Sequence, residues 1–292
     1  MKIIARIRGG LGNQLFCYAA ARRLAVLNNA ELVIDGVTGF VRDQLYRRNY
    51  MLNRFQISAR KATPSERMEP FERYRRGVAK WLARRVPFEQ RRYIEQESLD
   101  FDERLLRISV KGTIYLDGLW ENESYFKDAE QIIREDLQVI PPTDDMNKRI
   151  AAEIHEKSAV AIHVRWFSAP GSSVSHHIST DYYRDALNLI ENTVGKPHYF
   201  LFSDNLDAAR TMLSLPEGRV TFMSHNRGSD NAYADLWLMT QCKHIIIANS
   251  TFSWWGAWLN KNSLKVVVAP CKRRITENNL SCAPPPASWI QV

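Results

Sequence analysis

Short apolar runs alternate with longer amphipathic stretches along this chain of 292 residues. A short apolar run rich in β-branched residues is typical of a strand buried in a parallel sheet, whereas apolar residues at every third or fourth position indicate a helix. Strands are predicted at residues 2–8, 31–35, 113–116, 159–164, 198–202, 220–222, 244–248 and 264–269. Helices are predicted at 15–27, 180–190 and 253–259. Repeated strand, helix, strand units predict an α/β fold with parallel sheets.

A second cycle of strands and helices begins after a proline-containing segment. Residues 137–143 include Pro141 and Pro142 and are the most linker-like stretch of the chain. We therefore predict two domains, residues 1–150 and 151–292. Two α/β halves joined in this region would leave a cleft between them.

Composition and charge limit the possible partners. With 45% hydrophobic residues the chain can form a substantial core. Its 40 Lys and Arg against 32 Asp and Glu give a net charge of +8, which favours an anionic partner: a nucleotide, a nucleic acid or an acidic membrane surface. No apolar run approaches the roughly 20 residues of a membrane span. We expect a soluble or at most membrane-peripheral protein.

The four cysteines show neither Cys-x-x-Cys pairs nor zinc spacing with histidine. This pattern favours inert thiols in a reduced, cytoplasmic compartment. A disulfide between Cys271 and Cys282 remains the alternative.

The segment 67–92 is strongly basic and also aromatic. Its apolar residues at helical spacing are Phe71, Tyr74, Val78, Trp81 and Leu82, with arginines between them. Such a helix can lie on an anionic membrane, or pack its apolar face inward and leave the other face in solvent. We favour the packing interpretation, with membrane or acceptor contact as the alternative. Nucleic acid is disfavoured because no recognised nucleic-acid module accompanies the segment.

Polar residues follow three of the predicted strands: Arg165, Asp204 and the cluster 249–253, Asn-Ser-Thr-Phe-Ser. The carboxyl ends of parallel strands share one edge, so these residues are expected to converge on a ligand. The cluster leads into a helix whose first amides lack partners, a site that either binds phosphate or is capped by its own hydroxyls. Arg165 could give two parallel hydrogen bonds to a phosphate, or form a structural ion pair.

The glycine-rich turn at residues 9–14 opens the first predicted helix. It lacks the Gly-Lys-Ser/Thr ending of a P-loop, and Leu15 occupies the place of the third glycine of a dinucleotide fingerprint. Asn13 and Gln14 could offer amide hydrogen bonds there, or the turn could be purely structural.

Carboxylates occur at two places with different meanings. Asp100-Phe101-Asp102 could suggest a metal, but its position before a short helix favours capping, and we predict no metal site. Glu121 and Glu123 follow the strand at 113–116, where α/β proteins place their chemistry, so they are candidate general bases, with Asp117 as a third.

Five motifs occur in the order and spacing of one enzyme family. They are Gly-Gly-Leu-Gly-Asn-Gln-Leu-Phe at 9–16, Trp120 with Tyr125-Phe126, His163-Val164-Arg165, Phe202-Ser203-Asp204, and Asn-Ser-Thr-Phe-Ser-Trp-Trp-Gly-Ala at 249–257. Through them the chain resembles the α-1,2-fucosyltransferases of glycosyltransferase family 11 over essentially its whole length.

The resemblance implies two Rossmann-like domains facing each other, the GT-B type. It implies GDP-fucose as donor, inversion at the anomeric carbon, no required metal, and transfer to the 2-hydroxyl of a galactose-type glycan acceptor. Members without an anchor are typically bacterial and cytoplasmic.

The resemblance also implies residue roles. Arg165 is similar to the donor-phosphate arginine, with His163 as its companion. Ser250, Thr251 and Phe252 look like the donor-binding turn, with Asn13 facing the donor from the N-terminal domain. From their positions we add Asp204, Asn249 and Ser253 to the donor site. Trp254, Trp255 and Trp258 are expected to be core residues that support the turn.

One motif departs from the family. His-x-Arg is usually followed by Arg-Gly-Asp, but here by Trp166-Phe167-Ser168. The missing guanidinium and carboxylate imply an altered acceptor preference, a remodelled loop through residues 169–172, weaker activity, or a binding protein that has lost turnover. His176 and His177 lie further along this loop and are expected to be solvated, with a reach to the site as the alternative.

Overall fold

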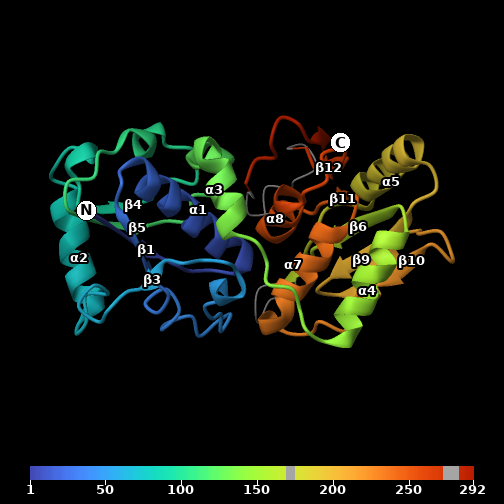
Figure 1. Ribbon diagram of the computed structural model, residues 1–292, viewed down its shortest axis with the longest axis horizontal. Helices are drawn as coiled ribbons and strands as arrows, with labels where there is room; N and C mark the ends of the chain where they lie inside the picture. The colour runs from blue at the N-terminus through green and yellow to red at the C-terminus, as the bar shows by residue number, and fades with distance from the viewer. Residues whose placement is uncertain (169–174, 272–282) are drawn as a thin grey trace. The chain divides into compact units, whose positions relative to one another are not determined.

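The computed structural model describes residues 1–168, 175–271 and 283–292. The chain divides into two compact units, Met1–Gln138 and Val139–Val292. Each unit contains a parallel sheet with helices (Figure 1), which confirms the α/β prediction. None of the helices in the described part of the chain is long and apolar enough to cross a membrane.

Unit 1 is built on a five-stranded parallel sheet in the order β3-β2-β1-β5-β4. Its strands are β1 Lys2–Arg6, β2 Glu31–Asp35, β3 Arg60–Lys61, β4 Tyr93–Glu95 and β5 Thr113–Asp117. Its helices are α1 Leu11–Leu27, α2 Glu72–Ala83 and α3 Glu130–Asp136, with the short 3-10 turns η1 Leu52–Arg54, η2 Phe88–Gln90, η3 Glu103–Arg107, η4 Glu123–Tyr125 and η5 Lys127–Ala129. Asp102 caps η3 by accepting from the amide of Arg104, as the capping interpretation of that segment predicts.

Helix α1 begins four residues earlier than predicted. Gly9 has φ +80°, a conformation that favours glycine, and Gly10 is the N-cap. The buried Gln14 fastens this turn: its Nε2 donates to the carbonyls of Gly9 and Asn49, and its Oε1 accepts from the amide of Met51. Gln14 therefore stabilises the glycine-rich turn.

Helix α2 is oriented opposite to the favoured prediction. Its aromatic residues face solvent, with Phe71 77%, Tyr74 75% and Trp81 56% exposed. The side that packs on the sheet instead carries small or charged residues, including Ala83 and the buried Arg76. The inner face is thus filled without the large apolar residues, and the interpretation that α2 packs its apolar face inward is wrong.

Unit 2 is built on a six-stranded parallel sheet in the order β10-β9-β6-β11-β12-β13. Its strands are β6 Ala159–Val164, β9 His198–Ser203, β10 Val220–Phe222, β11 His244–Ile246, β12 Val267–Ala269 and β13 Ile290–Gln291. Two further strands, β7 Phe167–Ser168 and β8 Ser175–His176, form an antiparallel pair. The helices are α4 Asp145–Glu156, α5 Thr180–Val194, α6 Leu206–Met212, α7 Ala232–Gln241 and α8 Thr251–Leu259, with the 3-10 turn η6 Ser229–Asn231.

The central strands of unit 2 are held by α5 as well as by their ladder. The hydroxyl of Tyr182 donates to the carbonyl of Ile247 at 2.6 Å, and that of Tyr183 donates to the carbonyl of His163 at 3.0 Å. The adjoining core cluster contains Val160, Ile162 and Val164 of β6 and Ile246 of β11, and all four are fully buried. This rigid centre fixes the strand ends from which the candidate site is built.

The prediction of inert thiols is confirmed for two of the cysteines. Cys17 and Cys242 are buried free thiols, as expected, and burial raises the pKa of Cys17 to about 12. The alternative disulfide involves Cys282, which lies outside the described residues.

Candidate active site

In unit 2 the candidate site lies at the carboxyl edge of the sheet, where β9, β6 and β11 are neighbours. Arg165 follows β6 and Asp204 follows β9, and the two pair through Nη1 and Oδ2 at 2.6 Å. The other carboxylate oxygen of Asp204 accepts from the amide of Trp166 at 2.7 Å. Asp204 therefore holds both the side chain of Arg165 and the backbone that follows it.

The ion pair is not buried. The side chain of Arg165 is 38% exposed and that of Asp204 is 31% exposed. A solvated ion pair contributes little to stability. An arginine oriented by a carboxylate at an accessible strand end is well suited to meet an anionic ligand.

His163 is a neutral imidazole next to the start of α8. It is only 5% exposed, and its ring lies 5.5 Å from that of Phe252, the second residue of the helix. Burial, together with the charge of Arg165, lowers the pKa of His163 to about 3. Its buried Nδ1 has no hydrogen-bond partner within the described residues. This nitrogen is therefore available for a hydrogen bond from outside the described residues, and a bound ligand is one source of such a partner.

The turn that starts α8 is both capped and open to an anion. Ser250 is the N-cap, and its hydroxyl accepts from the amide of Phe252. Ser253 is fully buried, accepts from the amide of Ala248 at 3.2 Å and donates to the carbonyl of Ser250 at 3.4 Å. The first turn carries no acidic side chain, so the positive end of the helix dipole is not neutralised there.

Of the other residues predicted in this turn, Asn249 and Thr251 are partly exposed. The tryptophans that follow the turn pack beneath it in the core. Trp254, Trp255 and Trp258 are buried and in ring contact with one another. Their prediction as core residues is confirmed.

The segment that departs from the usual motif begins at Trp166 and is held by a contact with a residue further along the chain. Trp166 stacks on His177, with ring centroids 4.1 Å apart and planes at 16°. The pair β7 and β8 lies between these two residues in the sequence. His177 is therefore a stacked, partly buried residue, and the expectation that it is solvated is wrong. Residues 169–172 of the predicted loop lie outside the described residues.

Unit 1 has its own polar group at the carboxyl edge of its sheet. Asp117, at the end of β5, pairs with Arg6 at 3.0 Å and with Lys80 at 3.2 Å, and it accepts from the hydroxyl of Tyr93 at 2.7 Å. Burial alone would raise the pKa of Asp117, but the charges of Arg6 and Arg8 are the main opposing influence and lower it to about 2. Such a strongly stabilised carboxylate is a poor proton acceptor.

Glu121 has the opposite properties. Burial raises its pKa to about 7, although the charge of Arg8 acts to lower it. A carboxyl group that titrates near neutral pH is suited to exchange a proton with a substrate. Glu123, the other predicted base, begins η4 and is partly exposed, as is Asn13 in the first turn of α1.

The loop that carries Glu121 is rigidly held. Trp120 is buried and has φ 55°, a left-handed conformation that is costly for a bulky residue. Gln96 compensates by accepting from the amides of Leu119 and Trp120 at 2.7 and 3.2 Å. The loop is therefore preorganised, and Glu121 emerges from a fixed backbone.

We predict that Gly118→Ala lowers both stability and activity. An added Cβ would lie 2.5 Å from the Trp120 ring and 2.6 Å from Cβ of Gln96, so the loop has to shift. Overpacking of this kind costs about 1–3 kcal/mol. Thermal unfolding and initial rates measure the two effects. Gly77→Ala is the matched control, because its Cβ would meet nothing within 4 Å; equal losses in the two variants would contradict the prediction.

The sequence did not identify Arg8 as a candidate. Its Nε is buried without a hydrogen-bond partner in the described chain and lies 3.9 Å from Asp117 Oδ1. Its position could have identified it, because Arg8 lies two positions beyond the end of a strand and directly before the glycine-rich turn. Among the described residues, no group of three or more His, Cys, Asp or Glu is placed to hold a metal ion.

Two parallel sheets, each with polar side chains at its carboxyl edge, define an α/β protein with two Rossmann-like units. Residues 2–278 match the family described as Glycosyl transferase family 11, and the chain belongs to this family of glycosyltransferases.

Two curated relatives from Escherichia coli span nearly the same length. An alpha-1,2-colitosyltransferase is 28% identical over 295 residues, covering 99% of this chain and 98% of the relative. The O-antigen biosynthesis glycosyltransferase WbnK is 30% identical over 294 residues, covering 91% of this chain and 93% of the relative.

Solved structures show similarity of fold. NodZ alpha-1,6-fucosyltransferase soaked with GDP-fucose has a TM-score of 0.50 at 18% identity, covering 88% of this chain and 92% of that one. A mutant of Arabidopsis thaliana FUT1 in complex with GDP has a TM-score of 0.52 at 11% identity, covering 94% of this chain and 71% of that one. The predicted GT-B fold class is confirmed.

Proposed function

We propose that this glycosyltransferase transfers fucose from GDP-fucose, with inversion and without a metal, to the 2-hydroxyl of a galactose-type glycan. The observation that carries the proposal is the grouping at the carboxyl edge of unit 2. Arg165 is oriented by Asp204, and Nδ1 of His163, which has no hydrogen-bond partner among the described residues, lies next to the start of α8. A guanidinium, a neutral imidazole and a helix N-terminus together suit a diphosphate.

The donor would be held by unit 2. Arg165 and the amides at the start of α8 would stabilise the negative charge that grows on the β-phosphate as its bond to fucose breaks. Asn249, Ser250, Thr251 and Phe252 supply this turn. Ser253 would act by fixing the turn, since its hydroxyl is already engaged there. Asp204 would be a positioning residue, and Asn13 the contribution of the glycine-rich turn of unit 1.

The acceptor hydroxyl would lose its proton to a carboxylate of unit 1. Glu121 is the first candidate because its pKa is raised to about 7, and Glu123 is the second. Attack on the anomeric carbon from the side opposite the phosphate forms the new glycosidic bond as the old bond breaks, so a single displacement inverts the configuration. GDP leaves with the electron pair of the broken bond.

A second candidate donor is favoured by one of the relatives. That protein transfers colitose, which is fucose without its 3-hydroxyl. The 3-hydroxyl lets an enzyme discriminate strongly between the two sugars. A site whose polar groups hydrogen-bond the 3-hydroxyl of fucose leaves those groups unpaired when colitose binds. Because GDP-colitose would carry the same diphosphate as GDP-fucose, it is an alternative donor for the same residues.

The decisive experiment measures GDP release from GDP-fucose and from GDP-colitose, with a lactose-type acceptor and with or without EDTA. We expect acceptor-dependent release from GDP-fucose that EDTA leaves unchanged, and an α-1,2 linkage in the product by NMR. A clear preference for GDP-colitose would replace the donor assignment. GDP binding without release for any galactoside would instead support the binding-protein interpretation.

A further inference from the structure

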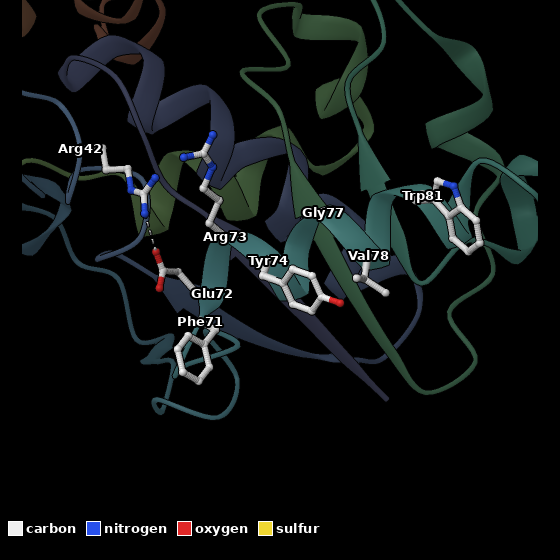
Figure 2. A pocket seen from close by; sticks show the side chains of 8 residues that line it. All are labelled: Arg42, Phe71, Glu72, Arg73, Tyr74, Gly77, Val78 and Trp81. Carbon is white, nitrogen blue, oxygen red and sulfur yellow. Dashed lines mark ion pairs between the residues drawn. The ribbon is translucent and has the colours of Figure 1, made fainter.

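The exposed side of helix α2 carries a row of large apolar side chains. Phe71, Tyr74, Val78 and Trp81 recur at intervals of three and four residues and project from one side of the helix (Figure 2). We call these four residues the α2 face. Phe71 precedes the helix as its N-cap, and all four are exposed. Monomeric proteins seldom expose aromatic residues in such a row, so the face is expected to have a partner.

The inner side of α2 explains why these residues are not needed in the core. Ala79 and Ala83 pack there against the cluster that contains Tyr93 and Tyr115. Lys80 reaches inward to pair with Asp117 at 3.2 Å. The helix is therefore attached to unit 1 by small and charged residues, and its apolar side is left for another contact.

Positive charge surrounds the α2 face. The segment 67–92 has nine Lys and Arg against three Glu. Arg73, Arg75 and Arg85 are exposed, and within the described residues no carboxylate forms an ion pair with them. The guanidinium of Arg85 lies over the ring of Trp81, so charge and aromatic surface are adjacent.

The face is also hollowed. Phe71, Tyr74, Val78 and Trp81 line a groove of about 780 Å³, together with Arg73 and with Arg42, which pairs with Glu72 at 3.9 Å (Figure 2). Gly77 lies between them and leaves open space where a side chain would stand. Apolar walls with the guanidinium of Arg73 at the margin suit a molecule that has both hydrocarbon and anionic parts.

We propose that the α2 face binds the surface of a bilayer that contains anionic phospholipids. Phe71, Tyr74 and Trp81 enter the interfacial layer, where amphipathic aromatic rings are favoured, and the arginines contact lipid phosphates. Charge argues against a second copy of this chain as the partner, because two such faces would repel each other. The proposal goes beyond the transfer reaction, since none of the four residues of the α2 face is among those assigned to donor binding or proton transfer.

The test is sedimentation of the full chain with vesicles of phosphatidylcholine alone or mixed with phosphatidylglycerol. We expect binding to the mixed vesicles, weakened by salt because the Debye length falls to about 3 Å at 1 M. Removing Arg73 or Arg85 by substitution with Ala should lower partitioning by about fivefold each. Phe71→Ala with Trp81→Ala should lower it by about tenfold or more.

Two matched controls separate the face from general surface effects. Arg107 is an exposed arginine of the same unit, paired with Glu103, and Leu264 is an exposed apolar residue elsewhere. Arg107→Ala and Leu264→Ala should leave partitioning unchanged. Circular dichroism should show all variants folded, and their rates with a soluble acceptor should match the unaltered chain.

Three results would overturn the proposal. They are equal binding to both kinds of vesicle, no binding to either, and self-association by light scattering that Trp81→Ala abolishes. The last would assign the α2 face to a second copy. Each is independent of whether the chain transfers fucose.

Discussion

Arg165→Ala is expected to lower kcat by about 10²–10³-fold while the protein remains folded. The guanidinium would stabilise the β-phosphate most strongly in the transition state, where negative charge grows, and removing one such donor typically costs this much. The fold should persist because the Arg165–Asp204 pair is solvated and contributes little to stability. Initial rates of GDP release and thermal unfolding measure the two quantities.

Two further variants test the geometry. Arg165→Lys keeps the charge but cannot give two parallel hydrogen bonds, so its rate should lie between those of Arg165 and Ala. Arg184→Ala is the matched control: this arginine of unit 2 also pairs with an aspartate, Asp181, at 2.6 Å, and its loss should leave kcat unchanged. Near-normal turnover of Arg165→Ala would remove Arg165 from the mechanism.

The long strands of the fold could be predicted because burial on both faces requires a continuous apolar run. β2 and β6 have the predicted bounds. β10 also has its predicted bounds, although it is short and only partly buried. β3, β4 and β13 are only two or three residues long and carry no periodic signal. Their edge positions in the sheets depend on pairing with strands distant in sequence.

The part of the candidate site that lies in one short segment could be predicted from the sequence. The strand, polar turn and helix around residues 249–253 can be recognised locally, and Arg165 and Asp204 could be grouped with it because parallel strands share an edge. The orientation of α2 could not be predicted, because the side of the helix that packs inward is set by the ion pair between Lys80 and Asp117, which are distant in the sequence. For the same reason Arg8 was missed: its significance comes from contacts to the end of another strand.

The activity is expected to depend on pH through the carboxyl group of Glu121. Burial raises its pKa to about 7, so the carboxyl group is largely protonated below that pH. A general base has to be deprotonated to act, and kcat/KM is therefore expected to fall about tenfold per pH unit below about pH 7 and to level off above it. Glu121→Gln keeps the size of the side chain but should lower the plateau by about 10²–10⁴-fold and remove this acidic limb.

Other variants distinguish Glu121 from groups that merely titrate nearby. Glu123→Gln should keep the acidic limb, and a lost limb in that variant would transfer the role to Glu123. Arg8→Met removes a positive charge that lowers the pKa of Glu121, so the limb should move to higher pH. A structural role for Glu121 predicts no such movement. If Glu121→Gln retains both its rate and the limb, the acceptor proton leaves without this residue, and a strongly dissociative transition state becomes the better account of the transfer.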